Sequence, residues 1–172
     1  MATFKFKKPI SKIEQPELLP KDWYSFRIST KPEVQENSKK TGENLFQRLR
    51  VVMPDDEMFD GRELPLWLAM PTDADEENYD SKGKKIADAK MERIVQFVEA
   101  SGGTAEEDEF DLSQGAMVGC YVIQALDQAG HDMENKIDIF AGFKSIEDLE
   151  PDEDAEGSDE DYKDVADGDS LL

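Results

Sequence analysis

Arginine and aromatic side chains alternate along one short segment near residue 48. In NLFQRLRVV, residues 44–52, Phe46, Arg48 and Arg50 are spaced by two. If this segment is a strand, the three side chains point the same way, because successive side chains alternate between the two faces. Cations that follow phosphates, beside aromatic rings on which bases stack, are the chemistry that holds a single-stranded nucleic acid. The spacing therefore indicates a nucleic-acid site.

Two neighbouring segments carry residues of the same kinds. Trp23 and Arg27 alternate with the apolar residues of DWYSFRIST (22–30), and Trp67 does so in LPLWLAM (64–70). Basic residues of the connecting turns could reach the same phosphates. We therefore expect one nucleic-acid-binding face formed by Trp23, Arg27, Lys39, Lys40, Phe46, Arg48, Arg50, Arg62 and Trp67. Phe140, Phe143 and Lys144 are further candidates on the last predicted strand.

Each of these residues also has a purely structural interpretation. Trp67 could be core on a strand buried on both faces, Trp23 could close one end of the domain, and Phe46 could pack under the N-terminal segment. The two arginines could form surface salt bridges, which contribute little to stability. Lys39 and Lys40 could serve only to keep their loop soluble. The sequence leaves these alternatives open.

Charge is distributed unevenly along the chain. The whole protein has 41 acidic and 20 basic side chains, a net charge of −21, which by itself argues against a polyanionic partner. Residues 1–50, however, contain eleven basic and six acidic side chains. Such asymmetry between the ends of a chain is typical of a nucleic-acid site with an acidic counter-segment.

Acidic side chains are densest in the last segment, residues 147–172, with thirteen acidic side chains and one lysine. A segment of this composition cannot bury enough apolar surface to fold alone, so we expect a disordered tail. Its partner-binding residues are predicted to be Asp159, Glu160, Asp161, Asp164, Asp167, Asp169, Leu171 and Leu172. Residues 1–20, with three prolines and no sustained period, are expected to form an N-terminal arm.

The segment between the two ends, residues 21–146, predicts a mainly β domain with one helix. Strands are expected at 22–30, 44–52, 64–70, 116–126 and 136–143, and the last two should form a hairpin. A helix is expected within 84–103, where apolar residues recur every three or four positions and Gly102 and Gly103 end the pattern. This order is that of an OB-fold, a five-stranded Greek-key barrel with a helix between strands three and four. A small open sheet backed by a helix is the alternative.

Several short motifs resemble a family of small phage proteins regarded as binding single-stranded DNA. They are DWYSFRI, KKTGENLFQRLRVV, MFDGRELPLWLAMP, IVQFVEASGG and QGAMVGCYVIQ, and the likeness covers roughly residues 20–146. The F-x-G-R-x-L element of that family corresponds to Phe59, Gly61, Arg62 and Leu64. The resemblance implies an OB-type domain that coats single strands during phage replication or recombination, without catalysis. It also implies an acidic tail that recruits replication or recombination proteins, although this tail ends in Asp-Ser-Leu-Leu rather than in an aromatic residue.

Other functional classes have little support in the residues. His131 is the only histidine and Cys120 the only cysteine, so neither a zinc cluster nor a disulfide framework is expected. SKGKK at residues 81–85 lacks the spacing of a phosphate-binding loop, and no nucleophile motif accompanies His131. We therefore expect no enzymatic activity and no bound cofactor or metal. Without an apolar run for a membrane or an export signal, a cytoplasmic protein is expected, the host cytoplasm if it is phage-encoded.

Two functions thus follow from the sequence. The first is a single-stranded DNA-binding protein that coats strands without strong sequence preference. The alternative is an acidic protein-interaction or DNA-mimic module, in which the net charge of −21 imitates a polyanion and inhibits a DNA-binding enzyme. Whether the protein forms a homo-oligomer, and whether it prefers DNA to RNA, is left open.

Overall fold

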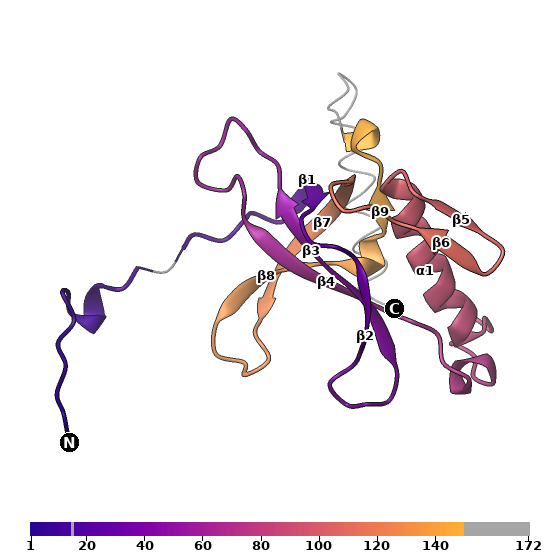
Figure 1. Ribbon diagram of the computed structural model, residues 1–172, viewed down its shortest axis with the longest axis horizontal. Helices are drawn as coiled ribbons and strands as arrows, with labels where there is room; N and C mark the ends of the chain where they lie inside the picture. Colours follow the sequence, from indigo (N-terminus) through magenta and orange to yellow (C-terminus); the bar gives the residue numbers. More distant parts are fainter. Residues whose placement is uncertain (15, 150–172) are drawn as a thin grey trace.

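Antiparallel strands and one helix make up the domain, which we describe from a computed structural model for residues 1–14 and 16–149 (Figure 1). Seven strands form the main sheet: β1 (Asp22–Ile28), β2 (Glu33–Glu36), β3 (Glu43–Val51), β4 (Glu63–Ala69), β7 (Met117–Leu126), β8 (Met133–Ile137) and β9 (Phe143–Lys144). A separate hairpin consists of β5 (Thr104–Glu106) and β6 (Glu109–Asp111). The helix is α1 (Ile86–Ala100), and four short 3-10 helices are η1 (Ile10–Lys12), η2 (Ala74–Glu76), η3 (Ile139–Ala141) and η4 (Ile146–Leu149).

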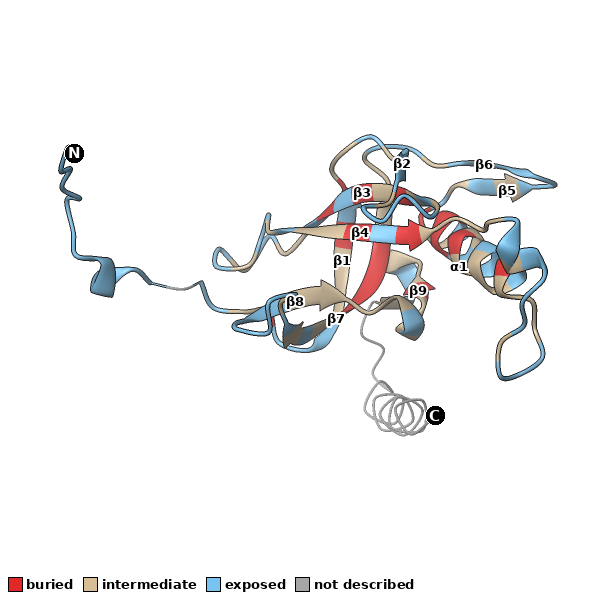
Figure 2. Ribbon diagram, turned by 90° about the horizontal axis from the view of Figure 1, so that it is seen from below, coloured by how far each residue is buried: buried red, intermediate tan, exposed pale blue. Residues whose placement is uncertain are grey.

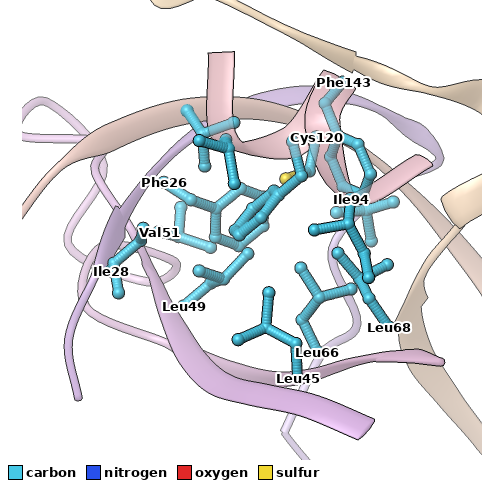
Figure 3. Close-up of a cluster of buried hydrophobic side chains, with 14 of the residues drawn as sticks. Phe26, Ile28, Leu45, Leu49, Val51, Leu66, Leu68, Ile94, Cys120 and Phe143 are labelled. Atoms are coloured by element: carbon cyan, nitrogen blue, oxygen red, sulfur yellow. The ribbon is translucent and has the colours of Figure 1, made fainter. Parts of the chain in front are cut away.

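The alternation of apolar and polar residues directs one face of β1, β3 and β4 into the core. Buried side chains recur at every second position: Phe26 and Ile28 on β1, Leu45, Leu49 and Val51 on β3, and Leu66 and Leu68 on β4. These side chains converge on Cys120 of β7, Ile94 of α1 and Phe143 of β9 (Figure 3). The predicted mainly β fold with one helix is therefore confirmed.

The strand order is β2-β3-β1-β7-β8, with β4 paired to β3 and β9 paired to β7. β3 pairs with β4 over most of its length, while β2 and β1 share its other edge at opposite ends. β4 and β8 lie side by side, but within residues 1–14 and 16–149 no strand pairing joins them. The described sheet thus has more strands than the five that the sequence predicted, and it is open between β4 and β8.

A short extended segment, residues 16–20, crosses this open seam, and we call it the strap. On one side Arg62 donates a hydrogen bond to the carbonyl oxygen of Glu17. On the other side the backbone N–H of Leu19 donates to Oδ1 of Asn135 on β8, and the Leu19 carbonyl oxygen accepts from Gln124 on β7 (2.9 Å each). Leu19 itself is fully buried. Of the predicted N-terminal arm, the last residues thus belong to the domain, while residues 1–14 extend away from it (Figure 2).

The helix α1 lies over one end of the core and ends as its sequence predicts. Gly102 has φ +80°, and its N–H donates to the Glu99 carbonyl oxygen. The N–H of Gly103 donates to the Val98 carbonyl oxygen. This pair of hydrogen bonds is a Schellman motif, which favours glycine because an L side chain rarely adopts positive φ. The ring of Phe97 on α1 meets that of Phe143 edge to face, with centroids 4.9 Å apart.

The predicted strand at 136–143 is broken into three parts. β8 ends at Ile137, η3 follows, and β9 begins at Phe143. The carboxylate of Asp138 accepts a hydrogen bond from the Phe140 N–H (2.9 Å), which stabilises the turn of η3 and competes with strand pairing. Gly142, at φ +83°, then leads the chain into β9, which pairs with β7 in the same antiparallel direction as β8. This side-chain hydrogen bond explains why the strand prediction fails there.

The outer face of β1 and β7 is covered by η4. An added Cβ at Gly119 of β7 would lie 2.5 Å from the Leu149 side chain, so the helix packs directly on the backbone there. The described domain thus extends to Leu149. The remainder of the predicted acidic tail, including every partner-binding residue proposed for it, lies outside the described residues. None of the described helices is long and apolar enough to cross a bilayer.

Candidate nucleic-acid interface

An aromatic pair stands on the outer face of β3 and β4. Phe46 and Trp67 lie directly opposite each other in the two strands, and their rings stack with centroids 5.2 Å apart and planes inclined by 27°. Phe46 is half-buried, whereas the Trp67 side chain is 52% exposed. The pair therefore presents an open indole face held in place by a neighbouring ring. This is the geometry on which an unpaired base can stack.

Arginine side chains continue the same outer face on β1 and β3. Arg48 and Arg50 follow Phe46 at intervals of two, and Arg27 lies directly opposite Arg50 in the pairing of β1 with β3. All three arginines are exposed. The Arg27 guanidinium donates a hydrogen bond to the Gly115 carbonyl oxygen (3.1 Å), which fixes its direction. The sheet register thus brings together Arg27, Phe46, Arg48, Arg50 and Trp67, as the sequence predicted.

The positive charge on this face is partly compensated by a glutamate on the same face. Glu63 lies opposite Arg50 in the β3–β4 pairing, and its carboxylate accepts a 2.7 Å hydrogen bond from the guanidinium. Arg48 lies opposite Pro65, which offers no charge. The salt-bridge alternative considered from the sequence is thus realised for Arg50. Arg48 is the better candidate for a phosphate contact.

The turn between β2 and β3 carries Lys39 and Lys40, both exposed. The turn is held by Asn37, whose Oδ1 accepts from the Thr41 N–H (3.0 Å) and whose backbone N–H donates to the Gly42 carbonyl oxygen (2.9 Å). Both lysines therefore project from a defined hairpin that pairs with the Phe46 end of β3. Their placement is compatible with a supporting electrostatic role at the edge of the face.

Trp23 does not share in the open face. It lies on β1 opposite Tyr121 of β7, and the two rings meet edge to face with centroids 5.4 Å apart. Nζ of Lys144 on β9 lies 4.4 Å from the Trp23 ring centroid. The indole is therefore half-buried beside the chain that follows β7, and its predicted part in binding stays a prediction.

Arg62 and the aromatic residues near the C-terminal end of the domain also differ from the prediction. Arg62 donates to the strap at Glu17 and lies over the Phe59 ring, 4.7 Å from its centroid, so its first role is structural. Phe143 is buried in the core, and Phe140 is exposed beside Arg93, whose guanidinium lies 4.8 Å from the ring centroid. Neither phenylalanine joins the Phe46–Trp67 pair in any described contact.

A groove of about 710 Å³ borders Trp67 along the open seam between β4 and β8. Besides Trp67, its polar lining includes Gln128 in the β7–β8 turn and Lys136 on β8, but also Asp127 and Glu134. Sequence reasoning missed Gln128 and Lys136, because only the folding of the β7–β8 hairpin beside β4 brings them to the site. The predicted hairpin was the one signal that could have pointed to them. The carboxylates make this groove less favourable for phosphate than the Arg48 side of the pair.

The titratable groups with clearly shifted pKa values lie away from the open face. Burial raises the pKa of the Cys120 thiol far above its ordinary value. Burial also raises the pKa of Tyr24 and Tyr121, with smaller contributions from nearby aspartates. Within the described residues, no group of three His, Cys, Asp or Glu side chains is arranged to hold a metal ion.

Comparison with known proteins gives no family assignment. No protein-family model matches the chain, and no curated protein is similar to it at a significant level. The function must therefore be inferred from the fold and from the outer face of β1, β3 and β4.

Proposed function

We propose that the protein binds single-stranded DNA through the outer face formed by Arg27, Phe46, Arg48, Arg50 and Trp67. The observation that carries this proposal is the exposed, stacked Phe46–Trp67 pair next to exposed arginines on the same face. Each base stacked on such a ring contributes roughly 1–3 kcal/mol whatever its identity, and arginines add an electrostatic contribution from phosphates. Coating without strong sequence preference follows from this chemistry.

The connectivity of the sheet supports an OB-type fold as the frame for this site. The pairing order β4-β3-β1-β7-β8, with α1 between β4 and β7, is that of an OB barrel in which the last pairing, between β4 and β8, is missing. OB-folds bind oligonucleotides on the face of their second and third strands, which here correspond to β3 and β4. Those are the two strands that carry the Phe46–Trp67 pair.

The biological setting is proposed from the resemblance to phage proteins. The protein would coat single strands in the host cytoplasm during phage replication or recombination, and its acidic tail would recruit partners or compete with DNA for the basic face. The strong negative charge of the tail is the feature that supports this regulatory role.

A titration with labelled oligo-dT and a matched duplex tests the proposal. The full-length protein and a form ending at Leu149 should both prefer the single strand, and the affinity should fall steeply with salt. Truncation at Leu149 rather than at residue 146 keeps the helix that packs on Gly119. The truncated form should bind more tightly if the tail competes for the face. Absence of single-strand preference in both forms would contradict the proposal.

A second candidate, an acidic module that mimics DNA, is favoured by one observation: the charge of Arg50 is compensated by Glu63 in a protein with net charge −21. The two candidates predict opposite effects of charge reversal. Arg48→Glu with Arg50→Glu should abolish binding to oligo-dT if the protein coats DNA. The same double variant should still inhibit a DNA-binding enzyme if the protein is a mimic, because the acidic surface is unchanged.

A further inference from the structure

The first fourteen residues form an arm that places apolar and basic side chains in solvent. In Figures 1 and 2 the arm extends from the side of the domain opposite α1. Phe4 is 88% exposed and Phe6 79% exposed, and Ile10 and Ile13 are exposed as well. Lysines alternate with these residues at positions 5, 7, 8 and 12. Large exposed apolar side chains gathered on one segment of a soluble protein usually mark a contact surface.

A groove on the far side of the domain has the complementary character. It lies between α1 and the β5–β6 hairpin, and its volume is about 210 Å³. Its apolar lining comes from Met70, Met91, Ile94, Val95 and Phe110. Pockets for small metabolites usually measure about 300–1,000 Å³, so this groove is better suited to a protruding side chain of a polypeptide.

The rim of the groove carries negative charge. Glu107, Asp108 and Glu109 of the hairpin line it, and all three are exposed. An apolar slot beside three carboxylates is complementary to a segment in which phenylalanine alternates with lysine. The sequence Phe4-Lys5-Phe6-Lys7-Lys8 of the arm has this alternation. A tail rich in acidic residues would instead be repelled by this rim.

We infer that the arm of one protein molecule docks in the α1/β5–β6 groove of a second copy. Phe4 or Phe6 fills the apolar slot, and the neighbouring lysines contact the acidic rim. Because the arm leaves the domain on the side away from its own α1, the contact joins two different molecules. It is heterologous, with arm on one side and groove on the other, so repetition produces an open head-to-tail chain. This self-association does not depend on DNA, although a head-to-tail chain would suit the coating of a strand.

Sedimentation velocity of the full-length protein without DNA tests the contact. The average mass should increase with protein concentration, and the double variant Phe4→Ala with Phe6→Ala should need roughly tenfold or more protein to reach the same mass, since aromatic anchors dominate interfaces. Met91→Lys should have a similar effect from the groove side. Met91 is exposed, and lysine is as favourable in a helix as methionine.

Met58→Lys is the matched control. It introduces the same substitution at another exposed methionine, in the loop between β3 and β4, which lies away from α1 in Figure 1. Its self-association should equal that of the unchanged protein. If Met58→Lys weakens self-association as much as Met91→Lys does, the effect arises from added charge and the inference is overturned.

Mixing the two defective forms gives the sharpest result. The arm variant keeps an intact groove and the Met91→Lys variant keeps an intact arm, so together they can form one contact and no more. At a protein concentration at which the unchanged protein just begins to associate, the mixture should contain heterodimers but no longer species, while each variant alone stays monomeric. A mixture that remains monomeric, or unchanged self-association of the arm variant, would overturn the inference.

Affinity for an oligonucleotide short enough for one protein molecule separates this contact from the proposed DNA function. The arm variant should bind it as tightly as the unchanged protein. If the arm variant self-associates normally but loses this affinity, the arm is a DNA-binding element and the inference is rejected. If no variant binds the oligonucleotide while self-association responds as described, the DNA function fails and the contact between copies stands.

Discussion

Arg50 on β3 and Glu63 lie opposite each other on the paired strands β3 and β4, with 2.7 Å between Nη2 and the carboxylate oxygen. DNA that uses Arg50 must compete with this carboxylate. We therefore expect Glu63→Gln to tighten binding to oligo-dT by about two- to fivefold, because an exposed ion pair contributes up to about 1 kcal/mol. Fluorescence anisotropy measures the change. Glu77→Gln, which removes another exposed charge, should have a smaller effect, and equal effects would indicate that only net charge matters.

Trp67 is expected to contribute most of the stacking energy. Trp67→Ala should weaken oligo-dT binding by roughly 1–3 kcal/mol, or about five- to 150-fold, because it removes the exposed ring and leaves Phe46 without its partner. The same titration with Trp23→Phe serves as the comparison. Trp23 is covered near Lys144 and Tyr121, so its substitution should change affinity little once the fold is shown to be intact by circular dichroism.

Close packing of Leu149 on Gly119 predicts a steric effect on stability. A Cβ at Gly119 would lie 2.5 Å from Cδ1 of Leu149 and 3.0 Å from the carbonyl oxygen of Lys144. Gly119→Ala should therefore lower the free energy of unfolding by about 1–3 kcal/mol, as overpacking does. Urea titration should show that adding Leu149→Ala costs less in this background than in the unchanged protein. Fully additive costs would show that Leu149 is not the obstacle.

Asp75 predicts a pH dependence of stability. The hydrogen bond from Lys90 lowers the pKa of Asp75 below its ordinary value of 3.8, and the Thr72 N–H adds to this shift. A carboxyl with a lowered pKa in the folded state stabilises the protein above its unfolded pKa, and loses that contribution as pH falls through the folded pKa. The difference in urea midpoint between the unchanged protein and Asp75→Asn should thus be largest near neutral pH and shrink below about pH 4.

The alternation of residues along β3 and β4 was enough to predict which of their side chains share the outer face. The spacing of Phe46, Arg48 and Arg50 gave their common outward direction, and alternation in β4 gave that of Trp67. These predictions succeeded because the buried face of each strand is fixed by its apolar residues. Gln47 illustrates the same rule: it shares the buried side of β3, where its side chain donates to the Leu66 carbonyl oxygen (2.9 Å).

The differences from the prediction arise where a distant segment covers a face or a local hydrogen bond interrupts a strand. Trp23 has the correct alternation, but β9 and η4, more than a hundred residues later, lie over that part of β1. Asp138 ends β8 through a side-chain hydrogen bond that periodicity does not reveal. The four residues of β2 are all exposed, so they have no buried face by which the strand could be recognised.

The strap takes the place of strand pairing along the seam between β4 and β8. In a closed barrel, a ladder of backbone hydrogen bonds would join β4 to β8. In this molecule the strap joins the two sides instead. On one side Arg62 donates a hydrogen bond to the Glu17 carbonyl oxygen, and on the other side Gln124 and Asn135 form hydrogen bonds with Leu19. Separating the two sides requires the loss of these side-chain hydrogen bonds but of no strand pairing among the described residues. At this seam, the wall of the groove beside Trp67 is thus held by side-chain hydrogen bonds to the strap and by the burial of Leu19, and not by a strand ladder.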